Sequence, residues 1–166
     1  VTGTDGRRHS FDHLVIAAGA WSHRLSRQLG DWCPLETERG YNTTLSNPGV
    51  SLNRMVTFAE DHFVATPMSV GLRIGGAVEF AGLDAPPNFN RSKALLRLAA
   101  KYLPELNLDG GTEWMGHRPS TPDSLPVIDR ASRYSNIFYA FGHGHLGLTG
   151  SATSGRLVAA LLRGEE

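Results

Sequence analysis

Residues 55–80 show the alternation of apolar and polar positions that is typical of antiparallel strands. Two short runs, 55–59 and 62–66, flank Glu60 and Asp61 as a hairpin, and a longer run covers residues 72–80. Two adjacent glycines, Gly75 and Gly76, interrupt the longer run and indicate a bulge or a close approach by another backbone or a ligand. The pattern predicts a three-stranded meander.

Helical spacing of apolar residues follows the meander and returns at the end of the chain. One predicted helix begins at its cap, Ser92, and stops before Pro104. Its apolar stripe consists of Leu95, Leu96, Leu98, Ala99 and Tyr102. A second helix covers residues 151–162, with Gly164 as its C-cap, and a shorter one begins at Ser22 as N-cap and ends at Gly30.

Two further strands lie outside the meander. Residues 14–19 are continuously apolar, as in a strand buried on both faces, and residues 137–141 form an aromatic, β-branched run that stops at a glycine-rich loop. Residues 33–41, with Pro34 and Gly40 near their ends, are interpreted as a polar connection between substructures. Together these elements predict an α+β fold.

Composition limits the classes of protein to consider. Lys plus Arg and Asp plus Glu number 16 each, so no basic surplus favours nucleic acid or an acidic membrane surface. The single cysteine, Cys33, excludes an internal disulfide and fits a reducing compartment. No apolar run is long enough to span a membrane. We expect a cytoplasmic protein, with attachment to the inner face of a membrane and the oligomeric state left open.

The first residues suggest that the chain is the C-terminal part of a longer protein. Asp5 and Gly6 form a turn signal that would join two strands, yet only two residues precede Gly3, and the chain does not begin with Met. We therefore expect the chain to start inside a β-hairpin.

The glycine loop after residue 141 is the strongest candidate ligand site. Its residues are Gly142, His143, Gly144, His145, Leu146, Gly147, Leu148 and Thr149. A strand, a tight loop and a helix in this order bring unpaired N–H groups and the positive end of the helix dipole to one place, where an electron-rich group can bind. The glycines match G-x-G-x-x-G, but the acidic residue expected about 20 positions later is absent, so a dinucleotide-binding βαβ unit is not completed.

Two other segments carry candidate contacts. Small residues at positions 17–20 permit close approach of a backbone or a flat ligand, although tight strand–helix packing is the simpler interpretation. Arg118 lies in a segment stiffened by prolines, and its planar guanidinium matches a substrate carboxylate. An internal ion pair between Arg118 and Asp123 is the alternative.

The remaining candidates are single residues. His143 and His145 suit hydrogen-bonding or orienting roles better than general-base catalysis, because no acidic partner is close in sequence. Tyr41 could offer its hydroxyl to a ligand, although a packing residue with one hydrogen bond is the simpler interpretation. No set of His, Cys, Asp and Glu has metal-ligand spacing, so we expect no metal site.

These stretches, in their order along the chain, resemble the FAD-dependent enzymes of the D-amino-acid oxidase superfamily, especially D-amino-acid dehydrogenases and glycine oxidases. The resembling segments are residues 15–22, 38–41, 73–80, 116–126 and 142–149. The resemblance implies a flavin domain of α/β type, residues 1–40 and 114–166, interleaved with a mostly antiparallel substrate domain, residues 41–113. It also implies that the N-terminal dinucleotide-binding unit lies outside these residues.

The resemblance further implies the cofactor, the reaction and the site. FAD would contact Ala18, Gly19 and the loop from Gly142 to Thr149. Arg118 would bind the substrate carboxylate, and Tyr41 and His145 would lie near the substrate. The reaction would be oxidative deamination of a D-amino acid by hydride transfer from Cα to flavin N5, without a catalytic side chain. Oxidation of a secondary amine such as D-hydroxyproline or sarcosine, and a non-catalytic flavoprotein subunit, are the alternatives.

Overall fold

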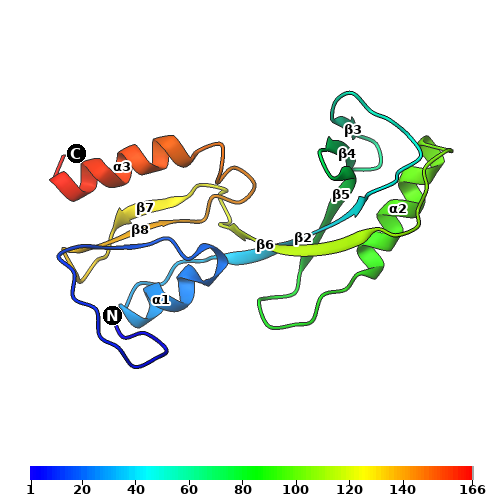
Figure 1. The fold of residues 1–166 in the computed structure, drawn as a ribbon. Coiled ribbons are helices and arrows are strands. Elements are labelled where there is room, and N and C mark those ends of the chain that lie inside the picture. Colours follow the sequence, from blue (N-terminus) through cyan, green and yellow to red (C-terminus); the bar gives the residue numbers. More distant parts are fainter. Residues whose placement is uncertain (166) are drawn as a thin grey trace. The chain divides into compact units, whose positions relative to one another are not determined.

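A computed structural model describes residues 1–165 of the chain, which divides into two compact units. Unit 1 contains residues 1–36 and 118–166, and unit 2 contains residues 37–117. The resemblance placed the corresponding divisions at residues 40 and 114. Each unit combines a β-sheet with one or more helices, which confirms the predicted α+β fold (Figure 1).

Unit 2 is built on a five-stranded sheet in the order β3-β4-β5-β2-β6. The predicted meander is confirmed as β3 (Val56–Phe58), β4 (Phe63–Met68) and β5 (Gly71–Phe80), which pair antiparallel. The predicted bulge is confirmed too, because the register between β2 and β5 shifts beside Gly76. Gly76 has a φ of 150°, and a Cβ there would lie 2.5 Å from the carbonyl oxygen of His62. Close packing therefore requires glycine at this position.

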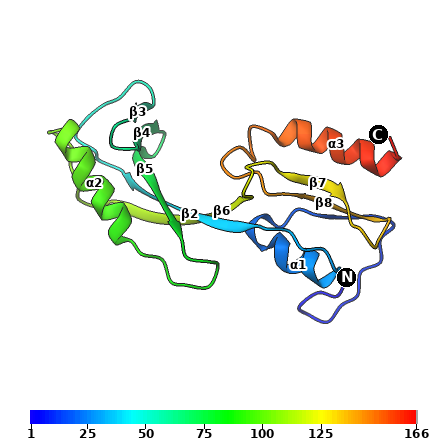
Figure 2. The same ribbon diagram turned by 180° about the vertical axis from the view of Figure 1, so that it is seen from behind.

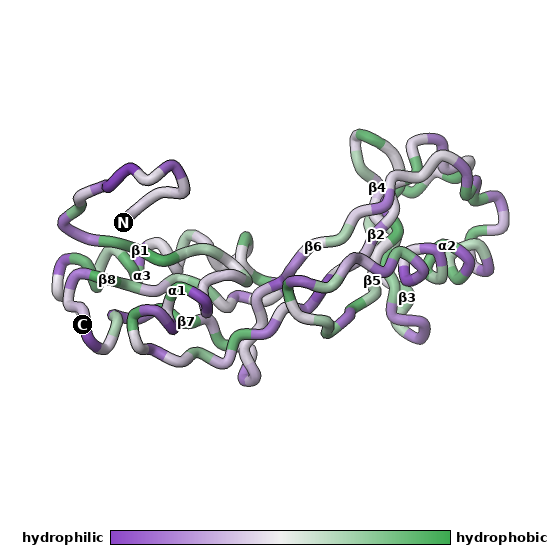
Figure 3. The backbone as a smooth tube through the Cα atoms, turned by 90° about the horizontal axis from the view of Figure 1, so that it is seen from below, coloured by the Kyte–Doolittle hydropathy of each residue, from purple (hydrophilic) through white to green (hydrophobic). Residues whose placement is uncertain are grey.

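A single helix, α2 (Asn90–Tyr102), covers one face of this sheet. The core between them contains Leu45, Phe63, Ile74, Leu95 and Ala99. In Figure 3 the helix alternates between hydrophobic and hydrophilic stretches, as expected when only one face is buried. The helix begins at Asn90, so the prediction that Ser92 caps it is wrong. Ser92 is buried in the first turn and donates to the carbonyl oxygen of Phe89 at 2.8 Å.

The segment predicted as a polar connection is largely a strand, β2 (Glu36–Leu45), next to β6 (Thr112–Ser120) in the sheet order. The charged residues of this segment made it resemble a surface connection in the sequence. In the structure, however, Arg39 is completely buried and donates to three carbonyl oxygens of the loop that follows β5. A charged residue can occupy a buried strand position when its donors are satisfied in this way.

Unit 1 contains a three-stranded sheet in the order β1-β8-β7, formed by β1 (Leu14–Ile16), β7 (Val127–Arg130) and β8 (Ile137–Phe141). β1 is parallel to β8, and β7 is antiparallel to it. The helices α1 (Ser22–Gln28) and α3 (Ser151–Arg163) lie on opposite sides of this sheet, as Figures 1 and 2 both show. Ile16, Tyr139 and Phe141 belong to its buried core.

Three expectations for unit 1 have different outcomes. Gly164 ends α3 in a left-handed conformation with a φ of 73°, as predicted. The prediction that residues 14–19 are buried on both faces is wrong, because β1 is an edge strand of this sheet and Val15 is exposed. Ser22 is not an N-cap, because a 3₁₀ turn, Gly19–Trp21, precedes α1. The Ser22 hydroxyl is buried, and it has no hydrogen-bond partner among residues 1–165.

Candidate functional site

Two of the predicted cofactor-binding segments lie at the same edge of the sheet in unit 1. β1 and β8 are parallel, and Ile16 pairs with Tyr139. Ala18 and Gly19 follow the carboxyl end of β1, and the glycine loop follows the carboxyl end of β8. In open sheets with parallel strands, this edge is where ligands bind. Ala18 is exposed, and space is open around Gly19, where an added Cβ would meet nothing within 4 Å.

The glycine loop is attached to the end of β6. The Gly144 N–H donates to the carbonyl oxygen of Pro119 at 2.7 Å, and Ser120 and His143 form an antiparallel bridge. Gly142 and Gly144 have φ angles of 85° and 52°, which a residue with a side chain adopts only with strain. These contacts place the loop beside Pro119 and Ser120, the two residues that follow Arg118 in the strand.

The N-terminus of α3 is open to a ligand. Its N-cap, Gly150, provides no side-chain hydrogen bond, and no acidic residue lies in the first turn. The Ser151 N–H donates to Leu148, and the Ser154 N–H donates to Gly150. A helix of this length carries a partial positive charge at its first turn, where N–H groups lack intrahelical acceptors. An electron-rich ligand group is therefore favoured in front of this turn.

A histidine and two leucines determine the shape and surface of the loop. His143 Nε2 lies 2.8 Å from Ser154 Oγ, so the imidazole joins the loop to the first turn of α3. Leu146 and Leu148 are 65% and 91% exposed. Exposed leucines beside an open helix terminus offer an apolar surface to whatever covers the loop. His145 and Thr149 are exposed in the same loop.

Arg118 lies in the extended backbone of β6, and its Nη1 atom is buried. The alternative partner, Asp123, accepts a hydrogen bond from the Leu125 N–H at 3.0 Å. That bond is the main cause that lowers the pKa of the Asp123 carboxyl, with a smaller contribution from Thr121. Asp123 therefore stabilises the turn before β7.

His117 precedes Arg118 and belongs to unit 2. Its Nδ1 atom lies 2.9 Å from Thr37 Oγ1. Burial lowers the pKa of the imidazole, and the positive charge of Arg39 lowers it further. His117 is therefore neutral at neutral pH and acts here as a hydrogen-bonding group of the sheet.

Tyr41 is buried inside unit 2, with 1% of its surface exposed. Its hydroxyl donates to Glu79 at 2.5 Å and accepts a hydrogen bond from the Asn88 N–H at 3.1 Å. This is the packing role with a satisfied hydroxyl that the sequence also allowed. A contact between Tyr41 and substrate stays a prediction and would require the hydroxyl to give up one of these bonds.

Sequence analysis missed a group of polar residues on the sheet of unit 2. Asn42, Thr44 and Arg73 line a depression together with Trp114. Asn42 and Thr44 directly follow the segment, residues 33–41, that was interpreted as a connection, so their shared face was not recognised. Asn42 and Thr44 alternate with Thr43 and Leu45 along the chain. This spacing of two residues was the signal that could have placed Asn42 and Thr44 on one face of a strand.

The described chain contains neither a candidate metal cluster nor a candidate membrane-spanning helix. Within residues 1–165, no group of three or more His, Cys, Asp and Glu side chains could hold a metal ion. No helix in the same range is long and apolar enough to cross a membrane.

Comparison with known proteins identifies the family of the chain. Residues 1–161 match the DAO family, described as FAD dependent oxidoreductase. The chain belongs to this family of FAD-dependent oxidoreductases, as the ordered motifs predicted.

Named relatives are enzymes that act on amino acids. A D-amino-acid oxidase of Bradyrhizobium diazoefficiens is 45% identical over 159 residues, which cover 93% of this chain and 38% of that protein. A D-amino acid dehydrogenase of Paramagnetospirillum magneticum is 36% identical over 156 residues, covering 92% of this chain and 37% of that protein. The chain therefore spans less than half the length of these curated relatives.

Solved structures extend the similarity to the fold. Glycine oxidase from Geobacillus kaustophilus superimposes with a TM-score of 0.82 at 26% identity, covering 98% of this chain and 44% of that one. Iminodiacetate oxidase from Chelativorans sp. BNC1 superimposes with a TM-score of 0.81 at 24% identity, covering 99% of this chain and 46% of that one.

The residues of the loop fit a flavin. The open first turn of α3 suits an electron-rich ring edge, and the exposed leucines suit a flat apolar surface. Glycine at position 144 permits the left-handed φ of 52°, and an added Cβ there would pack 3.4 Å from Ser120 Oγ.

Proposed function

We propose that the whole protein to which this chain belongs oxidises a D-amino acid with FAD, and that unit 1 carries the flavin-ring end of the site. The main supporting observation is the attachment of the glycine loop to β6 through Gly144 and Pro119. It keeps Arg118 two residues from the bridge that anchors the loop. The strand β6, which carries Arg118, is thereby joined to the loop that leads into the open N-terminus of α3.

In the proposed mechanism, Arg118 binds the substrate carboxylate through two parallel hydrogen bonds and orients Cα. Bound FAD supplies the hydride acceptor. The N–H groups and dipole of the first turn of α3 stabilise negative charge on a ligand held in front of them. No side chain of this chain is assigned a proton transfer, because a neutral amine loses hydride without a base. The resulting imino acid is hydrolysed by water.

The cofactor contacts are assigned to the residues at the carboxyl edge of the sheet. Ala18 and Gly19 offer small, accessible backbone beside β1, and the loop from Gly142 to Thr149 offers glycine backbone and the two exposed leucines. His143 is assigned the role of holding the loop against α3 through Ser154. His145, which is exposed, is proposed to lie near the substrate.

The direct test is anaerobic mixing of the FAD-loaded whole protein with D-alanine and L-alanine. Loss of visible flavin absorbance with the D-form alone is the expected result. Reduction by sarcosine or iminodiacetate but by no D-amino acid would favour a secondary-amine substrate. A flavin that no amine reduces would overturn the proposed oxidation.

The role of Arg118 is tested by Arg118→Leu. Removing a charge-assisted pair of hydrogen bonds is expected to raise KM roughly 10- to 100-fold while the flavin stays bound. Arg118→Lys keeps the positive charge but not the planar fork of the guanidinium, so its KM should lie between those of the wild-type protein and Arg118→Leu. Arg163→Leu, at the far end of α3 where Arg163 pairs with Glu165, is the matched control and should leave KM unchanged. An unchanged KM in Arg118→Leu would assign Arg118 a structural role.

A further inference from the structure

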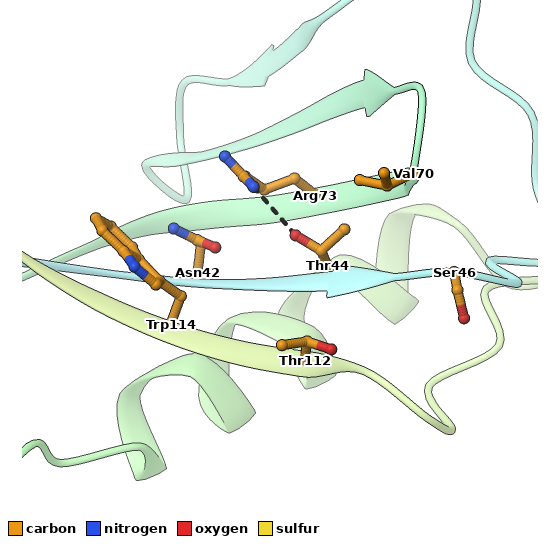
Figure 4. Close-up of a pocket in the computed structure, with 7 residues that line it drawn as sticks. All are labelled: Asn42, Thr44, Ser46, Val70, Arg73, Thr112 and Trp114. Atoms are coloured by element: carbon orange, nitrogen blue, oxygen red, sulfur yellow. Dashed lines mark hydrogen bonds between the residues drawn. The ribbon is translucent and has the colours of Figure 1, made fainter.

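The sheet of unit 2 carries a groove of about 380 Å³ on the face opposite α2. Along β2, Thr43 and Leu45 point into the packed side, so the alternating positions Asn42 and Thr44 point to the other face. Side chains of β5 and β6 complete the groove, as Figure 4 shows. Its lining combines polar side chains and one cation, Arg73, with the apolar surfaces of Val70 and Trp114, and it contains no carboxylate.

Arg73 presents most of its hydrogen-bonding capacity to this groove. Its Nε donates to Thr44 Oγ1 at 3.1 Å, which holds the guanidinium above the sheet. Within residues 1–165, Arg73 forms no ion pair with an acidic side chain. Both terminal nitrogens remain available to donate two parallel hydrogen bonds to a carboxylate.

Asn42 adds a polar atom that lacks a partner in the described chain. Its Oδ1 is buried, and no hydrogen-bond donor of residues 1–165 reaches it. A buried amide oxygen without a donor is unfavourable, so a ligand that brings an O–H or N–H to this point gains from satisfying it. Figure 4 shows Asn42 between Arg73 and Trp114.

Trp114 forms a flat apolar wall of the groove. A Cβ added at Gly116 would lie 2.0 Å from the indole Cη2 and 2.6 Å from Cζ2, so the ring lies along β6 directly over Gly116. Trp114 is 56% exposed despite this fixed position of its ring. An exposed aromatic face held in place by a glycine is suited to stacking with another planar ring.

We propose that this groove binds a small aromatic carboxylate that carries a hydrogen-bond donor on its ring. The carboxylate pairs with Arg73, the ring packs on Trp114, and the donor reaches Asn42 Oδ1. This inference goes beyond the proposed oxidation and does not rest on it, because every residue involved belongs to unit 2 and the arginine is a different one.

The probe is 4-hydroxyphenylacetate, titrated into FAD-loaded whole protein labelled with ¹⁵N-tryptophan. The Trp114 indole signal, assigned by its loss in Trp114→Phe, should shift in a saturable way. Arg73→Gln should weaken this binding by at least about tenfold, with Arg73→Lys in between. Arg97→Gln, an exposed arginine of α2, is the matched control and should bind normally.

Three analogues test the parts of the ligand separately. Phenylacetate lacks the donor, 4-hydroxyphenylacetamide lacks the charge and 4-hydroxycyclohexylacetate lacks the planar ring, so each should bind more weakly than the probe. Gly116→Ala should displace the Trp114 indole and weaken binding, although this substitution removes none of the side chains that are proposed to contact the ligand. If Arg73→Gln does not fold, as judged by its melting curve, Arg73→Lys and Gly116→Ala carry the test.

Two results would overturn the inference. One is unchanged affinity at the Trp114 signal in the Arg73 variants. The other is binding that leaves the Trp114 signal unmoved and disappears in Arg118→Leu, which would assign the probe to Arg118. Neither result affects flavin reduction by D-alanine, so the proposed function and this inference are tested independently of each other.

Discussion

Replacing Arg39 by leucine should destabilise unit 2 more than any change to its exposed ion pairs. The guanidinium is fully buried and donates to the carbonyl oxygens of Gly82, Ala85 and Pro86 at 2.7, 2.8 and 3.2 Å. Its Nη1 also lies 3.8 Å from Glu79 Oε2. Arg39 therefore connects β2 to the loop between β5 and α2.

The size of the effect depends on what the substitution leaves unsatisfied. Each hydrogen bond from a charged donor contributes about 1.5–3 kcal/mol, so three independent bonds would sum to roughly 5–9 kcal/mol. Ala85 and Pro86 are exposed, so water can replace the donor there and only the less accessible Gly82 carbonyl loses its partner outright. Glu79 keeps Tyr41 and Arg91 as partners. We therefore expect the free energy of unfolding to fall by about 3–5 kcal/mol, the range typical when one partner of a buried ion pair is removed.

Hydrogen exchange in the whole protein measures this loss directly. Amides of β5 should exchange faster in Arg39→Leu by about two to four orders of magnitude, and the 81–89 loop should lose protection. Arg91→Leu removes the exposed partner of the same carboxylate and should cost at most about 1 kcal/mol. Equal protection in the two variants would refute the reasoning, since burial would then make no difference.

Two further predictions concern other parts of the chain. The Tyr41 hydroxyl is the main cause that lowers the pKa of Glu79, so Glu79 contributes stability that is present above the ordinary carboxyl pKa and is lost as the pH falls through the lowered value. Tyr41→Phe should flatten the acid dependence of the urea midpoint, and an unaltered dependence would exclude this contact as its source. Gly144→Ala should cost about 1–2 kcal/mol through its φ of 52° and weaken FAD retention, measured by dialysis and absorbance. Gly155→Ala, inside α3 with open space around it, should stabilise by about 1 kcal/mol and retain FAD, and equal behaviour of the two variants would contradict a special role for Gly144.

The inferred ligand groove and the proposed flavin site use the two units differently. In unit 1 the candidate contacts are largely backbone groups at the carboxyl edge of a sheet, supplemented by Arg118. In unit 2 they are side chains on the open face of an antiparallel sheet, where neighbouring strands bring residues 42, 73 and 114 together. Substitution of side chains should therefore affect the groove strongly and the glycine loop mainly where glycine itself is replaced.

The sequence by itself determined the elements whose signals are local. The meander of β3, β4 and β5 followed from alternation and turns, and α3 with its Gly164 cap followed from helical spacing and a left-handed glycine. The motifs, taken in their order along the chain, also indicated the family that matches residues 1–161.

Only the tertiary structure decided the features that depend on partners distant in sequence. β2 looked like a polar connection until the loop carbonyls more than 40 residues away satisfied Arg39. Val15 looked buried because an apolar run does not show whether its strand is central or at an edge. The contact of Gly144 with Pro119 and the groove beside Arg73 arise from strand pairing. Strands pair through hydrogen bonds between backbone groups, and these groups are the same in almost every residue. A local sequence pattern therefore does not show which segments pair with each other.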